Sequence, residues 1–177
     1  MAGRSGALVN VADKVSSFDT NHPDVKFSVC IASATAALLT TLTRTNMQTL
    51  YDTSGEWRWS DAKKNSEFSH PKSRFFIWGD QPVGGFLCFR FLVESGLPVM
   101  YIWELQVVEK GAGIGSKLLS LASKFCQTQT AIKDQFLTCF SANQPALDFY
   151  YKHGFRIHKS SPPNACYRIL CRKLVSN

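Results

Sequence analysis

The chain has 177 residues, of which 45% are hydrophobic and 19% are charged, and its formal net charge is +7 at pH 7. This composition excludes disordered and collagen-like proteins, and the length is sufficient to bury a core without disulfides or metal ions. We therefore expect one globular domain at residues 26–177, preceded by a polar segment at residues 1–25.

The sequence shows no signal for export or for a membrane. The first ten residues lack the apolar centre of a signal peptide, and the small apolar run at residues 30–39 is too short to span a bilayer. The six cysteines form no Cys-x-x-Cys pair and have no His at zinc-finger spacing. We expect reduced core thiols, no metal site, no membrane contact, and a location in the cytoplasm and nucleus.

The positive charge has two interpretations. A basic surface is typical of nucleic-acid-binding proteins, but here the Lys and Arg residues are scattered and lack an interleaved aromatic stripe. A solvated surface that also favours cofactor phosphates explains the charge better. We therefore expect no direct contact with nucleic acid.

The first part of the chain predicts a strand, two helices and a second strand. Lys26–Ile31 alternates polar and apolar residues, which is typical of an edge strand, and residues 34–54 have the apolar spacing of a helix. Ser60 is a suitable N-cap for a short helix at residues 61–68. A strand follows at residues 73–78.

A long hairpin comes next. After a turn at residues 79–82, Val83–Val93 predicts a strand, and the glycine in Glu94–Pro98 predicts a tight turn into a second long strand. One face of the first strand carries Phe86, Cys88, Arg90 and Leu92, and the other carries Leu87, Phe89, Phe91 and Val93.

The second hairpin strand, Val99–Val108, contains one acidic residue in apolar surroundings. Every position except Glu104 and Gln106 is apolar or aromatic, which predicts a central strand buried on both faces. A buried carboxylate is strongly destabilising unless it is hydrogen-bonded, paired or hydrated in a cleft. Glu104 is therefore either a catalytic base beside a cleft or a structural partner in an ion pair.

The segment Lys110–Ser116 carries three glycines at alternate positions, immediately before a helix whose apolar face starts at Ile114. The spacing fits neither the nucleoside-triphosphate loop nor the dinucleotide fingerprint. It fits the Arg/Gln-x-x-Gly-x-Gly/Ala loop that binds the pyrophosphate of acetyl-CoA, except that Lys110 stands in the first place. Backbone N–H groups of a glycine turn at a helix N-terminus bind anions. A glycine-rich helix start without a ligand remains the alternative.

The last part predicts alternating strands and helices, namely a strand at 135–140, a helix at 143–153 with Asn143 as its N-cap, a strand at 154–158 and a strand at 167–174. This element order predicts an α/β fold, with a mixed, mostly antiparallel central sheet of about seven strands flanked by helices.

The glycine loop and the segment Ala146–Phe155 together resemble the GNAT superfamily of acetyl-CoA-dependent N-acetyltransferases. Within it, the chain is similar to the NatD-type N-terminal acetyltransferases of histones, over roughly residues 40–173. The segments that carry this similarity are 42–51, 56–59, 89–91, 101–106, 137–138 and 160–162. The resemblance implies a GNAT fold, acetyl-CoA as cofactor, and histone H4 and 2A-type histone tails beginning Ser-Gly-Arg as partners. We expect a monomer.

The resemblance also implies a set of site residues. Those facing the cofactor are Leu105, Gln106, Val107, Lys110, Gly111, Ala112, Gly113, Ile114, Gly115, Ser116 and Asn143. Those lining the peptide pocket are Tyr51, Trp57, Glu94, Tyr101, Trp103, Glu104, Thr138, Ser160 and Tyr167. The aromatic residues among them are equally consistent with core packing. The loop is about two residues shorter than in that family, and Leu92 replaces an acidic residue that helps to hold the peptide's Arg, which leaves Glu94 for that task.

The chemistry follows from the pKa of an α-amine, which is about 8. Glu104 would accept the amine's proton through a water molecule. A backbone N–H near Val107 would polarise the thioester carbonyl, and Tyr150 stands where many members of the superfamily carry a general acid. Cys139 has no suitably placed His, so we interpret it as a packed thiol.

Three functions remain open. The first is N-terminal acetylation of histone tails, which requires a narrow pocket closed by Tyr51 and Tyr167. The second is acetylation of a lysine or another small amine, which requires an open groove. The third is binding of acyl-CoA or a histone tail without turnover, which Lys110 and Leu92 would permit.

Overall fold

A computed structural model describes residues 2–80 and 82–174. The strands are β1 (Val25–Val29), β2 (Arg74–Trp78), β3 (Gly85–Glu94), β4 (Leu97–Val107), β5 (Asp134–Phe140), β6 (Arg156–Ile157) and β7 (Tyr167–Lys173). The helices are α1 (Ala2–Ala12), α2 (Ser33–Thr53), α3 (Asp61–Phe68), α4 (Ile114–Gln129) and α5 (Gln144–Lys152). No helix within the described residues is long and apolar enough to cross a membrane.

The strands form one mixed sheet in the order β1-β2-β3-β4-β5-β7-β6. The pairing of β4 with β5 is parallel, and the other pairs are antiparallel. The predicted α/β class and seven-stranded sheet are therefore confirmed. The turn expected at residues 79–82 includes Gln81, which lies outside the described residues.

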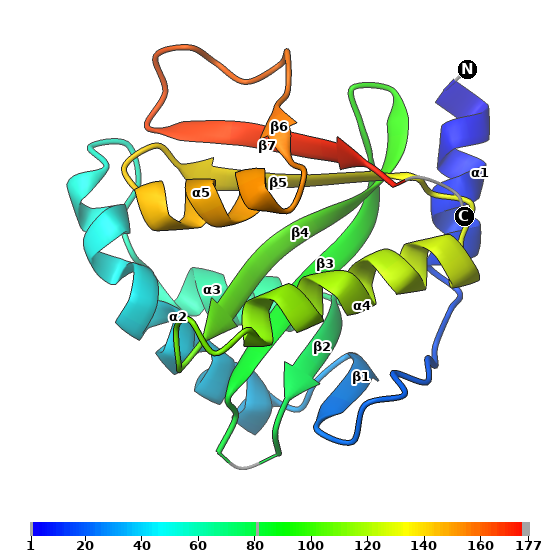
Figure 1. Cartoon of the computed structure of the whole chain (residues 1–177), viewed down its shortest axis with the longest axis horizontal. Helices are drawn as coiled ribbons and strands as arrows, with labels where there is room; N and C mark the ends of the chain where they lie inside the picture. The colour runs from blue at the N-terminus through cyan, green and yellow to red at the C-terminus, as the bar shows by residue number, and fades with distance from the viewer. Residues whose placement is uncertain (1, 81, 175–177) are drawn as a thin grey trace.

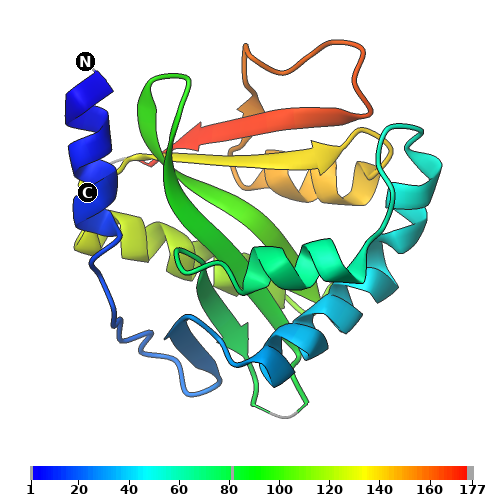
Figure 2. The same cartoon turned by 180° about the vertical axis from the view of Figure 1, so that it is seen from behind.

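Helices cover both faces of the sheet. On the face seen in Figure 1, α4 and α5 pack over a core that includes Phe76, Phe89 and Phe125. On the opposite face, seen in Figure 2, α2 and α3 cover a smaller core around Leu39, Phe68 and Phe86. The alternation predicted for Val83–Val93 is confirmed, because Leu87, Phe89 and Phe91 lie in the first core, and Phe86 and Cys88 in the second.

The N-terminal segment joins this core. Helix α1 contributes the buried residues Val9 and Ala12 to the core under α4, and Ser5 Oγ donates to the carbonyl oxygen of Gly96 in the β3–β4 turn, 2.9 Å away. The guanidinium of Arg74 in β2 also donates to the carbonyl oxygen of Asp13, directly after the helix.

Strands β4 and β5 separate part of the way along the sheet. They pair from Val99–Asp134 to Ile102–Leu137, and the rest of β4 pairs with β3 alone. Figure 1 shows the two strands diverging beyond this point. The prediction that residues 99–108 are buried on both faces is therefore wrong for the last part of the strand, where Trp103 is 37% exposed.

A β-bulge at Trp103 determines where Glu104 points. Cys88 pairs with Glu104 and Phe89 pairs with Ile102, so Trp103 is an extra residue in β4. Because directly paired residues share a face, Glu104 lies on the face of Cys88, toward α2 and α3. Tyr101 pairs with Arg90 and lies on the same face. Strict alternation along β4 would have placed Glu104 on the opposite face from Tyr101.

Two other expectations need correction. The strand predicted at residues 154–158 has only the two residues of β6, because Gly154 ends α5 with a left-handed φ of +84° and the chain turns again after Ile157. The six cysteines are unpaired, but only three of them are buried: Cys166 and Cys171 are half-buried, and Cys30 is exposed. Cys30 also has a left-handed φ of +64°, at the turn between β1 and α2.

Gly85 is expected to be essential for the close packing of β3, β4 and α4. A Cβ at this position would lie 2.9 Å from the carbonyl oxygen of Gln106 and 3.1 Å from a methyl group of Val107. We expect Gly85→Ala to lower the free energy of unfolding by about 1–3 kcal/mol, because the clash involves backbone that cannot move aside. Urea unfolding followed by circular dichroism measures this difference.

Gly6→Ala is the matched control, because a Cβ on this residue of α1 would meet nothing within 4 Å. Replacing a helical glycine by alanine there should stabilise the protein by up to about 1 kcal/mol. Equal unfolding midpoints for Gly85→Ala and the unmodified protein would contradict the proposed tight packing.

Candidate functional site

Most of the predicted site residues lie on the elements that border the opening between β4 and β5. Helices α2 and α3 border it on one face of the sheet, and the turn from β4 into α4 lies at its end (Figures 1 and 2). Past Ile102, β4 has no strand partner within the described residues on the side from which β5 has departed. The backbone groups on this side of β4 are therefore not used in sheet pairing.

Glu104 is buried at this position, with only 8% of its surface exposed. Its Oε1 lies 2.9 Å from Nζ of Lys64 in α3, and its Oε2 accepts a hydrogen bond from Nε2 of Gln106 at 2.8 Å. A carboxylate offers about four acceptor positions, so these two bonds leave lone pairs that can accept a hydrogen bond from a water molecule. Both interpretations of Glu104, as a base and as an ion-pair partner, are compatible with this geometry.

Lys64 is a residue of the candidate site that the sequence analysis missed. It is only 5% exposed, and its Nζ also lies 2.6 Å from Oε2 of Glu67 and 3.4 Å from the hydroxyl of Tyr51. Burial alone would lower the pKa of Lys64, but the Glu104 carboxylate, with Tyr51 and Glu67, holds this pKa above its usual value. The sequence feature that could have identified Lys64 is its spacing from Phe68, which places both residues on one face of α3.

Tyr51 joins this charged group to the predicted peptide pocket. Burial, followed by the negative charge of Glu104, raises the pKa of its phenol above the ordinary value. The phenol therefore stays protonated at neutral pH and can donate a hydrogen bond.

Asn46 in α2 extends the network to the backbone of β4. Its Nδ2 donates to Oε1 of Gln106 at 3.0 Å and to the carbonyl oxygen of Val107 at 3.1 Å. The Gln106 side chain was predicted to face a cofactor, but its amide forms hydrogen bonds within the protein. Sequence reasoning also missed Asn46, because a polar residue in a long helix normally faces solvent.

The Val107 N–H points into the opening. Val108 donates to the carbonyl oxygen of Gly84 at 2.9 Å across the hairpin. Because neighbouring residues of an antiparallel strand direct their backbone groups to opposite sides, the N–H of Val107 points away from β3. Its carbonyl, on the same side, is the one that meets Asn46. The same alternation places the backbone of Leu105 toward the opening.

The glycine loop has the form of an anion site. Gly111 and Gly113 adopt left-handed φ values of +87° and +79°, and a Cβ on either would meet nothing within 4 Å. Gly113 is the N-cap of α4 without a side-chain cap, and the helix's first backbone bond runs from Lys117 N–H to the Gly113 carbonyl oxygen. The N–H groups of Ile114, Gly115 and Ser116 thus have no partner within the helix. Lys110 and Ala112 are exposed beside them.

The remaining predicted cofactor residue, Asn143, has a structural role. Its Oδ1 accepts from the backbone N–H of Ala146 at 3.3 Å, so it caps α5 as expected. In the first turn of α4, Gly115 lies close to α5, because a Cβ there would lie 3.5 Å from the ring of Phe149.

An aromatic cluster borders the site on the side of α2. The ring of Trp57 stacks on that of Tyr167 with centroids 5.1 Å apart and planes 18° apart, and both Trp57 and Tyr51 contact Phe140. The backbone N–H of Cys166 donates to Oε1 of Glu56 at 2.9 Å. These contacts join the loop between α2 and α3 to the start of β7, across 110 residues of sequence.

The other predicted peptide residues lie in two places. Tyr101 hydrogen-bonds through its hydroxyl to Thr138 of β5, and burial, with a contribution from Glu94, raises its pKa. Trp103 lies under the guanidinium of Arg90, 4.6 Å from its ring centroid. Ser160 is exposed in the loop after β6, where its Oγ lies 2.7 Å from Nδ1 of His158. None of the hydrogen bonds of Ser160 within residues 2–80 and 82–174 reaches the aromatic cluster.

Tyr150 and Cys139 lie in the core beneath the site. Burial raises the pKa of Tyr150 above its ordinary value, and raises the pKa of the Cys139 thiol to about 12. Both groups are therefore neutral at physiological pH. A neutral thiol is consistent with Cys139 as a packed residue. The Tyr150 phenol carries a proton, and its raised pKa makes it a weaker acid than an exposed tyrosine.

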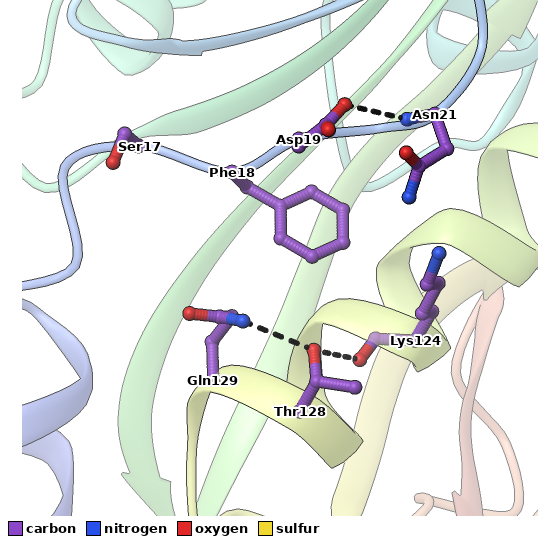
Figure 3. Close-up of a pocket in the computed structure, with 7 residues that line it drawn as sticks. All are labelled: Ser17, Phe18, Asp19, Asn21, Lys124, Thr128 and Gln129. Carbon is purple, nitrogen blue, oxygen red and sulfur yellow. Dashed lines mark hydrogen bonds between the residues drawn. The ribbon is translucent and has the colours of Figure 1, made fainter.

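Two hollows lie away from this opening. The larger, of about 690 Å³, is bounded by the segment before β1 and the C-terminal half of α4, and Figure 3 shows the side chains of Phe18 and Lys124 facing it. The other lies between β1, α2 and the β2–β3 turn. Neither contains a residue predicted for the site, and we assign no ligand to them.

Solved structures of acetyltransferases share this fold. Arabidopsis thaliana NAA60 with a bisubstrate analogue is 14% identical, covers 86% of this chain and 99% of its own, and has a TM-score of 0.63. Thermoplasma acidophilum PaiA N-acetyltransferase with coenzyme A is 16% identical, with coverages of 84% and 98% and a TM-score of 0.61. Arabidopsis thaliana Naa50 with the bisubstrate analogue CoA-Ac-MVNAL is 17% identical, with coverages of 85% and 99% and a TM-score of 0.53.

The sequence itself matches a family profile. Residues 39–155, well over half of the chain, match the acetyltransferase (GNAT) family. This region runs from α2 to the end of α5 and includes the hairpin, the bulge, the glycine loop and the opening between β4 and β5. The chain therefore belongs to the acetyltransferase (GNAT) family.

Proposed function

We propose that this acetyl-CoA-dependent acetyltransferase modifies the α-amine of protein N-termini, and that histone H4 and 2A-type histone tails beginning Ser-Gly-Arg are its substrates. The observation that carries the proposal is a bridge between two segments beside the site, which would cover the peptide pocket. The stack of Trp57 on Tyr167 and the Glu56–Cys166 hydrogen bond join the loop between α2 and α3 to the start of β7. A chain end can enter a covered pocket end-on, whereas an internal lysine needs a groove that is open along the peptide.

The structural neighbours support the class of acceptor. NAA60 was crystallised with a bisubstrate analogue, and Naa50 with the bisubstrate analogue CoA-Ac-MVNAL, which joins CoA to a peptide. The NatD-type specificity rests on the sequence motifs given above. Histone tails as substrates would place the protein in the cytoplasm and nucleus, and we propose that it acts there as a monomer.

The glycine loop fits the pyrophosphate of acetyl-CoA. The open N–H groups at the start of α4, together with Lys110, would hold its negative charge. When bound, acetyl-CoA supplies the thioester carbonyl that the amine attacks. The Val107 N–H, which points into the opening, would donate a hydrogen bond to that carbonyl oxygen.

Glu104 would prepare the amine for attack. Part of an α-amine population is already neutral at physiological pH, because its pKa is about 8. The carboxylate of Glu104 would accept the proton of the remainder through a water molecule, on an oxygen lone pair that Lys64 and Gln106 leave free. Tyr150, which is protonated, would donate a proton to the leaving thiolate.

We propose that Glu94 binds the Arg side chain at the third position of the peptide. After burial, the Glu94 carboxylate is a lesser cause of the raised pKa of the Tyr101 phenol, so it adds negative charge on the face of the sheet that carries Tyr101. A negative charge there would attract the Arg of a Ser-Gly-Arg sequence. Leu92, two residues earlier on the same face of β3, adds no charge.

One observation favours a second function. Both Glu104 oxygens already accept hydrogen bonds within the protein, which is the arrangement expected of a structural carboxylate. If Glu104 were only structural, the protein could bind acetyl-CoA and a peptide without transfer. Acetylation of a lysine or a small amine is the remaining enzymatic alternative.

A peptide assay separates these functions. The protein should acetylate a histone H4 tail peptide with a free α-amine and should leave the same peptide with a blocked α-amine unmodified, because only the chain end enters the covered pocket. Mass spectrometry of both peptides after incubation with acetyl-CoA measures the transfer. Modification of the blocked peptide would favour lysine acetylation, and cofactor binding without transfer to either peptide would favour the binding function.

Glu104→Gln should reduce kcat for the free peptide by about 100-fold or more, because a general base typically contributes 10²–10⁴-fold. The affinity for acetyl-CoA should change little, because the glycine loop is unaltered. Steady-state kinetics and calorimetric titration measure the two effects. Unchanged turnover in a folded Glu104→Gln variant would rule out this base.

Glu94→Gln tests the specificity for Arg. The substitution should raise KM about tenfold for a Ser-Gly-Arg peptide, because a charged hydrogen-bond partner is lost. It should leave KM unchanged for the matched Ser-Gly-Ala peptide. Equal increases for both peptides would contradict a contact between Glu94 and the Arg side chain.

A further inference from the structure

Lys64 is an unusual residue for a surface helix. Its neighbour Lys63 is exposed, but Lys64 is 5% exposed and lies between the helix and the sheet. Its ammonium group meets oxygens from three elements, Glu67 in α3, Tyr51 in α2 and Glu104 in β4. The ring of Phe68 lies beside it, with its centroid 5.9 Å from Nζ.

We propose that Lys64 is a positioning residue for acetyl transfer, which keeps Glu104 ionised and aimed at the opening between β4 and β5. The proposal rests on the proposed function, in which Glu104 accepts the proton of the amine. It adds a residue that touches neither the peptide nor acetyl-CoA and acts through Glu104.

The geometry shows why this carboxylate needs a cation. Glu104 is 8% exposed, and an isolated carboxylate with so little water around it would bind a proton. Lys64 lies 2.9 Å from Oε1 and opposes that effect, and Gln106 donates to Oε2. A protonated Glu104 could not accept a proton from the amine, so the ion pair is a condition for catalysis.

The other groups around the pair do not replace Lys64. Glu67 from α3 is negative, and the phenols of Tyr51 and Tyr150 and the thiol of Cys88 in β3 are neutral, with pKa values raised by burial. The nearby cation Arg90 is directed elsewhere, to Ser73 Oγ and the carbonyl oxygen of Glu67. Within the described residues, Lys64 is thus the cation in direct contact with Glu104.

The same network holds Glu104 in place. Gln106 is fixed by Asn46, which also binds the carbonyl of Val107. The carboxylate is therefore held from one side by Lys64 and from the other by a side chain tied to the backbone beside the proposed thioester site. Loss of Lys64 would release one of these two restraints.

Lys64→Met removes the charge and keeps an unbranched side chain, and Lys63→Met makes the same change at an exposed position one residue earlier in α3. The pH profile of kcat/KM for a histone H4 tail peptide is measured for both variants. For Lys64→Met we expect kcat/KM at pH 7 to fall about tenfold or more. The reason is that the acid limb of the pH profile should shift to higher pH by at least about one unit. The loss should diminish as the pH is raised toward 9, and calorimetry should show unchanged affinity for acetyl-CoA.

Lys63→Met should have the profile of the unmodified protein. A Lys64→Met variant whose loss is the same at every pH would overturn the proposal, because a purely structural role would not move the acid limb. A Lys64→Met variant with unchanged kcat/KM would overturn it as well.

A second comparison keeps the test valid if Lys64→Met is poorly folded. Lys64→Arg retains the charge and should recover most of the activity at pH 7. In the Glu104→Gln background, adding Lys64→Met should cause no further loss of kcat, because a residue that acts through Glu104 has no effect once the carboxylate is gone. Additive losses in this double variant would overturn the proposal.

The unmodified protein separates this inference from the proposed function. If it transfers acetyl to no peptide, both proposals fail. If it acetylates the free α-amine and its pH profile is insensitive to Lys64, only the positioning role fails.

Discussion

The buried ion pair between Lys64 and Glu104 is the interaction on which the arrangement of the site depends. It joins α3 to the central strand, and Gln106 and Asn46 extend it to α2. Removing either charge would leave the other buried beside the opening between β4 and β5, which is strongly destabilising. The pair therefore links the folding of the helical side of the sheet to the charge state of the proposed base.

Two irregularities of β4 make this interaction possible. The bulge at Trp103 turns Glu104 toward α3, and the departure of β5 after Ile102 leaves the adjoining backbone without a strand partner. In a regular sheet, Glu104 would point into the opposite core, and the N–H of Val107 would be used in a sheet hydrogen bond. The deviations from regular pairing thus create the position at which a carboxylate, a backbone donor and a ligand can meet.

The ends of the opening are built from different parts of the chain. Left-handed glycines before α4 expose backbone N–H groups at a helix N-terminus, where negative charge is stabilised. On the side of α2, Trp57 and Glu56 contact the start of β7 at the border of the site. A charged cofactor and a peptide end would therefore approach Glu104 from separate directions.

The sequence by itself determined the α/β class, most helix and strand positions, the hairpin and the glycine loop, because local periodicity, caps and turn residues encode them. It also singled out Glu104 as an acidic residue in apolar surroundings that needs a partner. Only the tertiary structure decided which partner, because Lys64 lies 40 residues away in a helix whose composition is polar. The bulge was likewise invisible, since an extra residue in one strand is defined by its pairing with another. Contacts between Glu56 and Cys166 depend on the return of β7 beside β5, and no local pattern in the chain specifies that meeting.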